Sequence, residues 1–268
     1  MPGAPDSAYV AARRVLLDAL EALTAHLDAL VLVGAQAIYL HTGEGDLAVA
    51  PYTTDADIAV DPAALAPEPA LEEMMLAAGF VLGAEPGIWF GVGAVEIDLL
   101  VPEAVGGGGR RGARLGTHGN RAARKARGLE AVLVDNTPME IRALEERDDR
   151  RFEIAVAGPA ALLVAKLHKL AERQGAVDRL QDKDALDVLR LLRETETGAL
   201  AATMRELLAD ERSTQVTHES IDQLRALFGA DGSAGSQMAA RAAQPLEDPA
   251  TIAASVAALA ADLLRALA

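Results

Sequence analysis

Residues 53–60 read Thr-Thr-Asp-Ala-Asp-Ile-Ala-Val, and this stretch decides which fold the chain is expected to adopt. Its β-branched and apolar residues predict a strand that closes at Asp61-Pro62. Side chains two positions apart on a strand point to one face, so Asp55 and Asp57 are expected to share one site. Neighbouring carboxylates repel each other, and a divalent cation relieves that repulsion. The stretch therefore predicts a metal site, with a merely solvated polar face as the alternative.

Two flanking segments favour the metal-site interpretation. Upstream, residues 31–35 (VLVGA) predict a strand, a tight turn at Gly34 and the start of a helix, where backbone N–H groups and the helix dipole can hold a phosphate. Downstream, residues 95–101 predict an apolar strand interrupted by Asp98, which would supply a third carboxylate. Glu96 lies on the same face by alternation and is a second candidate.

Helix and strand patterns are mixed on both sides of this centre. We expect helices at residues 7–28, with Ser7 as the N-cap, 35–41 and 70–78, and strands at 29–33, 53–60, 80–82, 88–92, 94–101, 129–134, 139–144 and 152–156. From residue 158 onward the pattern is helical, over 160–173, 183–193, 198–209, 221–228 and 249–267, with 229–236 as a flexible connector. The sequence predicts an α/β (α+β) domain with a mixed sheet at 1–157 and an α-helical bundle domain at 158–268.

Composition limits the classes of protein and of metal site. The chain has no cysteine, so a metal must be held by oxygen or imidazole, and a hard cation such as Mg²⁺ fits best. No apolar run approaches the roughly 20 residues of a membrane span, and the N-terminus does not resemble a secretion signal, so the cytoplasm is the expected location. The formal net charge of −15 argues against indiscriminate coating of nucleic acid.

One segment, residues 106–128, is positively charged, whereas the chain as a whole is negatively charged. It carries seven Arg or Lys and no acid, so the remaining residues together carry −22. The glycines among these cations predict a mobile loop that grips an RNA or nucleotide backbone, or a flexible hairpin tip without a ligand. The cations of this basic segment are Arg110, Arg111, Arg114, Arg121, Arg124, Lys125 and Arg127.

The helix expected at residues 160–173 carries a lysine on its apolar side. Lys166 shares a face with leucines three and four positions away, so its ammonium group needs an anionic partner. A bound triphosphate would supply one, and Asp184 or Asp187, which share a face of the next helix, would do so in its absence. The alternatives are a substrate-binding lysine and a structural ion pair between two helices. Lys169, near the same stripe, is either a substrate contact or a solvated cation.

The order of the Gly34 turn, the Asp55-x-Asp57 strand and Asp98 resembles the signature of the nucleotidyltransferase superfamily, which has a polymerase-β-like fold. Residues 162–173 (LLVAKLHKLAER) and 183–188 (KDALDV) are further similar to the AbiEii/MenT-like toxins of type IV toxin–antitoxin pairs. The match covers residues 31–192. It implies Mg²⁺ or Mn²⁺ held by Asp55, Asp57 and Asp98, further catalytic residues Lys166, Asp184 and Asp187, and nucleotide contacts at Gly34, Ala35, Thr54 and Lys169.

The resemblance also implies a reaction. A nucleoside monophosphate would pass from a triphosphate such as ATP to an acceptor hydroxyl, at the 3′ end of a tRNA or on a protein such as a cognate antitoxin. Two bound cations would bridge the triphosphate and activate the hydroxyl for attack on the α-phosphate. Ala35 stands where the family often has Gly or Ser, and Pro51 where it often has Arg. These departures suggest an alternative, a degenerate module that binds a nucleotide or a partner without catalysis. A further alternative, by resemblance to other members of the superfamily, is an enzyme that modifies a small molecule such as an antibiotic.

Overall fold

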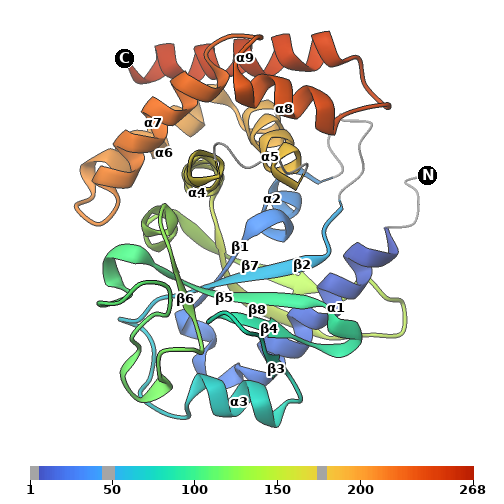
Figure 1. The fold of residues 1–268 in the computed structure, drawn as a ribbon, viewed down its shortest axis with the longest axis vertical. Coiled ribbons are helices and arrows are strands. Elements are labelled where there is room, and N and C mark those ends of the chain that lie inside the picture. The colour runs from blue at the N-terminus through green and yellow to red at the C-terminus, as the bar shows by residue number, and fades with distance from the viewer. Residues whose placement is uncertain (1–5, 44–51, 174–179) are drawn as a thin grey trace. The chain divides into compact units, whose positions relative to one another are not determined.

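The computed structural model describes residues 6–43, 52–173 and 180–268. The chain forms two compact units, whose elements are labelled in Figure 1. Unit 1 comprises Met1–Ala37, Pro51–Leu129 and Asn136–Ala157, and unit 2 comprises Ile38–Ala50, Glu130–Asp135 and Gly158–Ala268. Unit 1 holds a mixed sheet and unit 2 is helical, so the chain has the α/β and α-helical regions that the sequence predicts.

The sheet of unit 1 mixes parallel and antiparallel strands. Among the described residues its order is β3-β4-β5-β2-β1-β8-β7, with β6 paired to β5. β2 lies between β1, which is antiparallel to it, and β5, which is parallel to it. The strands are β1 (Leu30–Val33), β2 (Asp55–Val60), β3 (Val81–Leu82), β4 (Ile88–Phe90), β5 (Glu96–Pro102), β6 (Arg124–Ala126), β7 (Asn136–Arg142) and β8 (Arg151–Ala157).

The acidic residues of β2 and β5 lie at one end of these two strands. All of β1 is buried, and so are the second halves of β2 and β5. The acids of β2 and β5 lie in the first half of each strand, and because these two strands are parallel, the acids meet at the same edge. β1 runs the other way and ends there, so the turn that follows it reaches the same edge.

Helix α1 (Ser7–Ala22) covers part of the sheet by packing against β2, β5 and β8. The carboxylate of Asp6 accepts a hydrogen bond from the Ala8 N–H at 2.8 Å, so Asp6 is the N-cap and the prediction of Ser7 is wrong by one residue. The helix also ends earlier than expected and gives way to 3-10 helix η1 (Thr24–Ala29). The other short helices of unit 1 are α3 (Leu71–Ala77), η2 (Val92–Ala94), η3 (Glu103–Val105) and η4 (Gly116–His118). A further one, η5 (Leu129–Leu133), begins at the last residue of the Pro51–Leu129 part of unit 1 and otherwise belongs to unit 2.

The strand expected at residues 129–134 is wrong, because the chain forms η5 there. Leu129, Ala131 and Val132 are buried as the apolar run predicts. A short apolar run bounded by turn residues fits a buried helical turn as well as a buried strand, so periodicity could not separate the two.

Unit 2 is a bundle of helices. α7 begins earlier than expected, at Thr214, whose hydroxyl donates to the carbonyl oxygens of Leu208, in α6, and Asp210, in the turn that follows α6. α8 occupies the end of the expected connector at 229–236, which is therefore shorter than predicted. The helices are α4 (Pro159–Glu172), α5 (Leu180–Glu194), α6 (Thr197–Ala209), α7 (Thr214–Phe228), α8 (Ala234–Ala242) and α9 (Pro249–Leu267); α2 (Gly34–Thr42) begins in unit 1 and ends in unit 2.

Among the described residues one helix, α9, is long and apolar enough to cross a membrane by length and composition alone. The expectation that no apolar run approaches that length was therefore wrong. α9 packs against α5, α6, α7 and α8, and its buried face includes Ile252, Val256 and Leu263.

Candidate functional site

Four carboxylates meet at the edge of unit 1, and we call Asp55, Asp57, Glu96 and Asp98 the carboxylate cluster. β2 and β5 are paired in parallel, with Asp55 opposite Glu96 and Asp57 opposite Asp98. Residues directly opposite each other on neighbouring strands point to the same face, so all four side chains leave one face of the sheet. The structure thus brings the three predicted aspartates together with the second candidate, Glu96.

Gly34 lies directly beside Asp57. Val33 pairs with Asp57 across β1 and β2, and Gly34 follows with a φ of +70°. A Cβ added at this position would overlap the Asp57 carboxylate. Glycine is therefore required here both for its backbone conformation and for the close approach of Asp57. Ala35, the next residue, is buried, and the predicted departure at Pro51 lies outside the described residues.

Asp98 is the most buried member of the cluster, with 7% of its surface exposed. Burial raises the pKa of Asp98; the ion pair with Arg124 lowers it, and the nearby charges of Glu96 and Asp55 raise it further. The net direction is upward. Asp98 Oδ2 accepts a hydrogen bond from Arg124 Nη2, whereas the buried Oδ1 has no hydrogen-bond partner among the described residues. Asp98 therefore keeps one buried acceptor oxygen unused.

Arg124 is one residue of this site that the sequence interpretation missed. It had been placed only among the cations of the basic segment, whereas the structure puts it on β6, opposite Leu100 of β5. Burial alone would lower the pKa of Arg124, but the charges of Asp98, Asp57 and Glu96 outweigh burial and raise it. Arg124 is thus held as a cation by the cluster. No local spacing signals this contact, because it depends on a pairing between distant strands.

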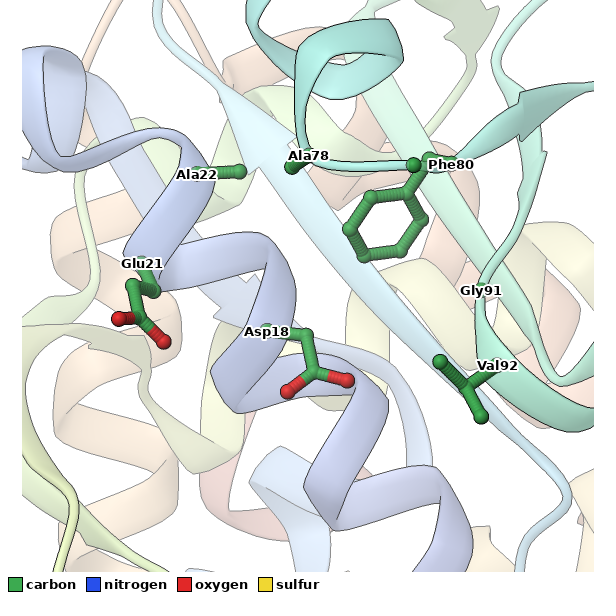
Figure 2. Close-up of a pocket in the computed structure, with 8 residues that line it drawn as sticks. Asp18, Glu21, Ala22, Ala78, Phe80, Gly91 and Val92 are labelled. Atoms are coloured by element: carbon green, nitrogen blue, oxygen red, sulfur yellow. The ribbon is translucent and has the colours of Figure 1, made fainter.

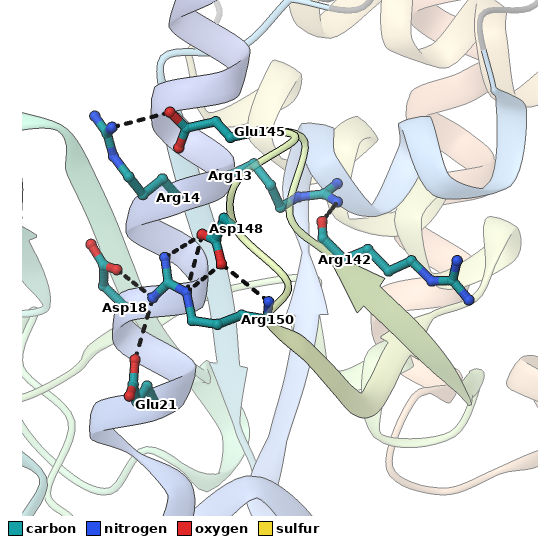
Figure 3. A network of polar contacts seen from close by, with 8 residues as sticks. All are labelled: Arg13, Arg14, Asp18, Glu21, Arg142, Glu145, Asp148 and Arg150. Carbon is teal, nitrogen blue, oxygen red and sulfur yellow. Dashed lines mark hydrogen bonds and ion pairs between the residues drawn. The ribbon is translucent and has the colours of Figure 1, made fainter.

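Three further polar side chains hold the start of β2. The Thr53 hydroxyl donates to Asp55 Oδ1, and Gln36 Nε2 donates to the Asp55 carbonyl oxygen at 3.2 Å. Arg13 of α1 donates through Nε to Gln36 Oε1 at 2.8 Å, and through Nη1 to the Arg142 carbonyl at 2.9 Å, as drawn in Figure 3. Arg13, Gln36 and Thr53 are all buried. These contacts position Asp55, and none was predicted; Thr54, the predicted nucleotide contact, is exposed.

The predicted residues of unit 2 form an ion cluster of their own. Lys166 Nζ lies 2.6 Å from Asp184 Oδ1 and 2.8 Å from Asp187 Oδ2, and all three side chains are buried. Burial alone would lower the pKa of Lys166, but the two carboxylates outweigh it and raise the pKa well above its usual value. Burial also opposes ionisation of Asp184, yet Lys166 and Lys169 together lower the pKa of Asp184 to about 2. This arrangement is the ion pair between helices, α4 and α5, that the sequence left as an alternative.

Lys169 lies at the edge of that cluster. Its Nζ is 3.4 Å from Asp184 Oδ1, and its side chain is 38% exposed. Arg173 makes a longer contact of 3.7 Å with the other oxygen of Asp184. Asp184 therefore has three cationic neighbours, of which Lys166 is the closest and most buried.

No group of three or more acidic or histidine side chains in the described part of the chain is arranged closely enough to hold a metal ion. The carboxylate cluster shares one face, but Arg124 occupies Asp98 Oδ2. The donors present are carboxylate oxygens, which suit Mg²⁺ or Mn²⁺. These oxygens, which include the buried Asp98 Oδ1 without a hydrogen-bond partner among the described residues, are of the type that such a cation binds.

The basic segment is folded onto unit 1 and does not form a free loop. Its strand β6 pairs with β5, and His118 Nδ1 accepts a hydrogen bond from the Leu71 N–H at 3.1 Å. Several of its cations are bound within the unit: Arg111 to Glu85, Arg127 to Glu103, Arg124 to Asp98, and Arg121 and Lys125 to backbone carbonyls. The expected mobile loop is therefore replaced by an anchored one.

A cavity of about 430 Å³ in unit 1 is drawn in Figure 2. Asp18, Glu21, Phe80 and Val92 help to line it, and no member of the carboxylate cluster does. Arg150 donates to Asp18 at 2.7 Å and lies 3.3 Å from Glu21, as Figure 3 shows. Both acids of this cavity therefore share one arginine, which also pairs with Asp148.

At this edge of unit 1 the carboxylate cluster lies beside a glycine turn at a helix start and a partly buried arginine. Carboxylate oxygens are the ligands that hard cations prefer, and the first N–H groups of a helix are donors that suit a phosphate. Comparison of the chain with models of protein families, with curated proteins and with solved structures finds no match.

Proposed function

We propose that the chain is a metal-dependent nucleotidyltransferase that moves a nucleoside monophosphate from a triphosphate to an acceptor hydroxyl. One observation carries this proposal: the parallel register that sets Asp57 opposite Asp98 and Asp55 opposite Glu96 at the edge where Gly34 begins α2. Carboxylates from two strands beside a glycine turn are what the resemblance to the superfamily implies.

Asp55, Asp57 and Asp98 would hold Mg²⁺ or Mn²⁺ in this proposal. A bound divalent cation neutralises triphosphate charge and lowers the pKa of an acceptor hydroxyl. The unused Oδ1 of Asp98 and the hard oxygen donors support this choice of cation. Thr53 and Gln36 keep Asp55 oriented through its carboxylate and its carbonyl.

The backbone at Gly34 would bind a phosphate of the substrate in this proposal. The first N–H groups of α2 have no acceptor within the helix, and the positive end of the helix dipole favours an anion there. A phosphate of the substrate would bind these N–H groups, which lie beside Asp57 because Gly34 has no side chain. The backbone thereby places the phosphate next to the carboxylates.

Labelling tests the proposal directly. The purified chain is incubated with Mg²⁺ or Mn²⁺, each α-labelled nucleoside triphosphate, and either total tRNA or total protein. We expect metal-dependent label on one acceptor, and its loss in Asp57→Asn and Asp98→Asn. Asp28→Asn is the control, because Asp28 is an exposed residue of η1 outside the cluster. Absence of label on every acceptor, the chain itself included, would count against an enzyme.

A second candidate is a module that binds a nucleotide or a partner without turnover. The observation that favours it is the ion pair of Arg124 with Asp98, which neutralises one of the proposed metal-binding carboxylates without any metal. Calorimetry separates the two candidates. Nucleotide binding that is equally strong with EDTA and with Mg²⁺, and that yields no pyrophosphate, supports the binding module.

A further inference from the structure

The pair formed by Arg124 and Asp98 links the basic segment to the carboxylate cluster. Arg124 Nη2 contacts Asp98 Oδ2, with the two side chains 33% and 10% exposed. Asp57 and Glu96 also act electrostatically on Arg124. One guanidinium therefore serves several carboxylates at once, which is the task that the proposed function assigns to a divalent cation.

The position of Arg124 is built into the fold. β6 pairs in parallel with β5 from Leu100 to Pro102, directly after the acids of that strand. Gly87, with a φ of +76°, makes room for it: a Cβ there would lie 2.8 Å from Arg124 Cγ and 2.6 Å from the Leu99 carbonyl oxygen. The close approach of three backbone segments thus fixes the base of the Arg124 side chain.

The far end of the same side chain is less tightly held. Arg124 Nε is buried and has no hydrogen-bond partner among the described residues, and the side chain is one-third exposed. The ion pair with Asp98 is therefore the contact that holds the guanidinium at the site. Asp98 Oδ1 likewise has no hydrogen-bond partner among the described residues. A guanidinium attached in this way can leave Asp98 without breaking another hydrogen bond of its side chain to the described residues.

We propose that Arg124 is an exchangeable counterion, which neutralises Asp98 when the site holds no metal and leaves that carboxylate when a divalent cation binds. This inference rests on the proposed function, because it requires that the cluster binds a cation. It makes the basic segment responsive to metal: a bound cation frees the Arg124 guanidinium for the phosphates of the substrate. The chain would then couple metal loading to triphosphate binding through one side chain.

Metal affinity tests the exchange. Free Mn²⁺ is measured by electron paramagnetic resonance during titration of the wild type, Arg124→Met and Arg127→Met. Arg127 is the matched control, because it lies in the same segment with 35% of its side chain exposed and pairs with Glu103 outside the cluster. Removing a competing charge from the site should tighten Mn²⁺ binding roughly tenfold or more in Arg124→Met, with no change in Arg127→Met.

A second measurement uses the wild-type chain, so it does not depend on the folding of a variant. Phenylglyoxal modifies arginines that are not held in ion pairs, and mass spectrometry reports the rate at each site. We expect Mn²⁺ alone, without nucleotide, to speed modification of Arg124 several-fold and to leave Arg127 unchanged. An unchanged rate at Arg124 at a saturating Mn²⁺ concentration overturns the exchange.

The possible outcomes separate this inference from the proposed function. Equal or weaker Mn²⁺ binding in Arg124→Met, while the wild type binds Mn²⁺, overturns the exchange and leaves the nucleotidyltransferase proposal standing. If neither the wild type nor Arg124→Met binds Mn²⁺, both the exchange and the nucleotidyltransferase proposal are overturned. Tighter binding in Arg124→Met with faster modification of Arg124 in the wild type supports both.

Discussion

Gly34 is the residue on which the shape of the site depends most directly. Its φ of +70° and the nearness of Asp57 act together, because a side chain would be strained in its backbone and would also push the carboxylate away. We expect Gly34→Ala to lower the free energy of unfolding by about 1–3 kcal/mol and to abolish metal-dependent labelling. Urea unfolding and the labelling assay measure the two effects.

Gly79→Ala is the matched control for that prediction. Gly79 also belongs to unit 1 and has a φ of +86°, but a Cβ there would meet nothing within 4 Å. It should lose a similar part of the stability through backbone strain and keep its labelling activity. Equal loss of labelling in both variants would mean that strain, and not the contact with Asp57, explains the Gly34 result.

The residues of the site differ in how far the sequence could reveal them. Asp55 and Asp57 are two positions apart on one strand, so local periodicity predicts their common face. Arg124 reaches the cluster through the pairing of β6 with β5, and Gln36 of α2 reaches Asp55 while Arg13 of α1 holds its side chain. Those contacts depend on tertiary packing, which single-sequence patterns do not encode. Sequence reasoning could therefore find the acids and not the groups that neutralise or orient them.

The ion cluster between α4 and α5 is expected to contribute to the stability of the chain. Lys166 is buried between Asp184 and Asp187, so Lys166→Met would remove the closest cation from two buried carboxylates and leave Asp184 only the more distant Lys169 and Arg173. We expect a loss of about 3–5 kcal/mol in the free energy of unfolding. Lys169→Met, at a partly exposed position, should lose no more than about 1 kcal/mol. Denaturant titration followed by circular dichroism measures both.

A compensated variant then separates a structural role of Lys166 from a catalytic one. Replacing Lys166 by Met and both Asp184 and Asp187 by Leu removes all three charges together, and should restore much of the lost stability. If the lysine only ties the two helices, this folded variant keeps its labelling activity. If Lys166 acts on the triphosphate, the variant stays inactive although it is stable.

The same contact predicts how stability depends on pH. The pKa of Asp184 is lowered from 3.8 to about 2, chiefly because Lys166 and Lys169 outweigh the opposing effect of burial. A carboxylate with a lowered pKa contributes stability that is complete above its unfolded pKa and is lost as the pH falls through the folded one. We expect roughly 2 kcal/mol to disappear between about pH 4 and pH 2. Urea midpoints across that range should fall less steeply in Asp184→Asn, and an identical slope would contradict the assignment.

Helices and strands with a clear period were predictable, and those defined by pairing or packing were not. β2 and β5 follow the alternation of their sequences, whereas β6 is a strand only because β5 offers it an edge. The run at residues 129–134 is apolar and buried, yet it forms η5. In both places the local sequence permits more than one conformation, and contacts with the rest of the unit select one.

The charge of the complete chain bears on which acceptor it uses. The net charge is −15, and among the cations of the basic segment Arg111, Arg124 and Arg127 are paired with carboxylates. The other four cations have no carboxylate partner among the described residues, although two of them bind backbone carbonyls: Arg110, Arg114, Arg121 and Lys125, the last two being those bound to carbonyls. A polyanion would therefore gain fewer phosphate contacts than the seven cations suggest.

Salt dependence of RNA binding gives the matching test. If tRNA binds through these four cations, log Kd should rise with log salt with a slope of roughly 3, because each neutralised phosphate releases a little under one counterion. Fluorescence anisotropy of labelled tRNA between 20 and 200 mM KCl measures the slope, and replacing Arg110 and Arg114 by Ser should lower it by about 1.5–2. A wild-type slope near 6 would require the paired arginines to leave their carboxylates. Absence of binding at 20 mM KCl would exclude this segment as an RNA contact and favour a protein or small-molecule acceptor.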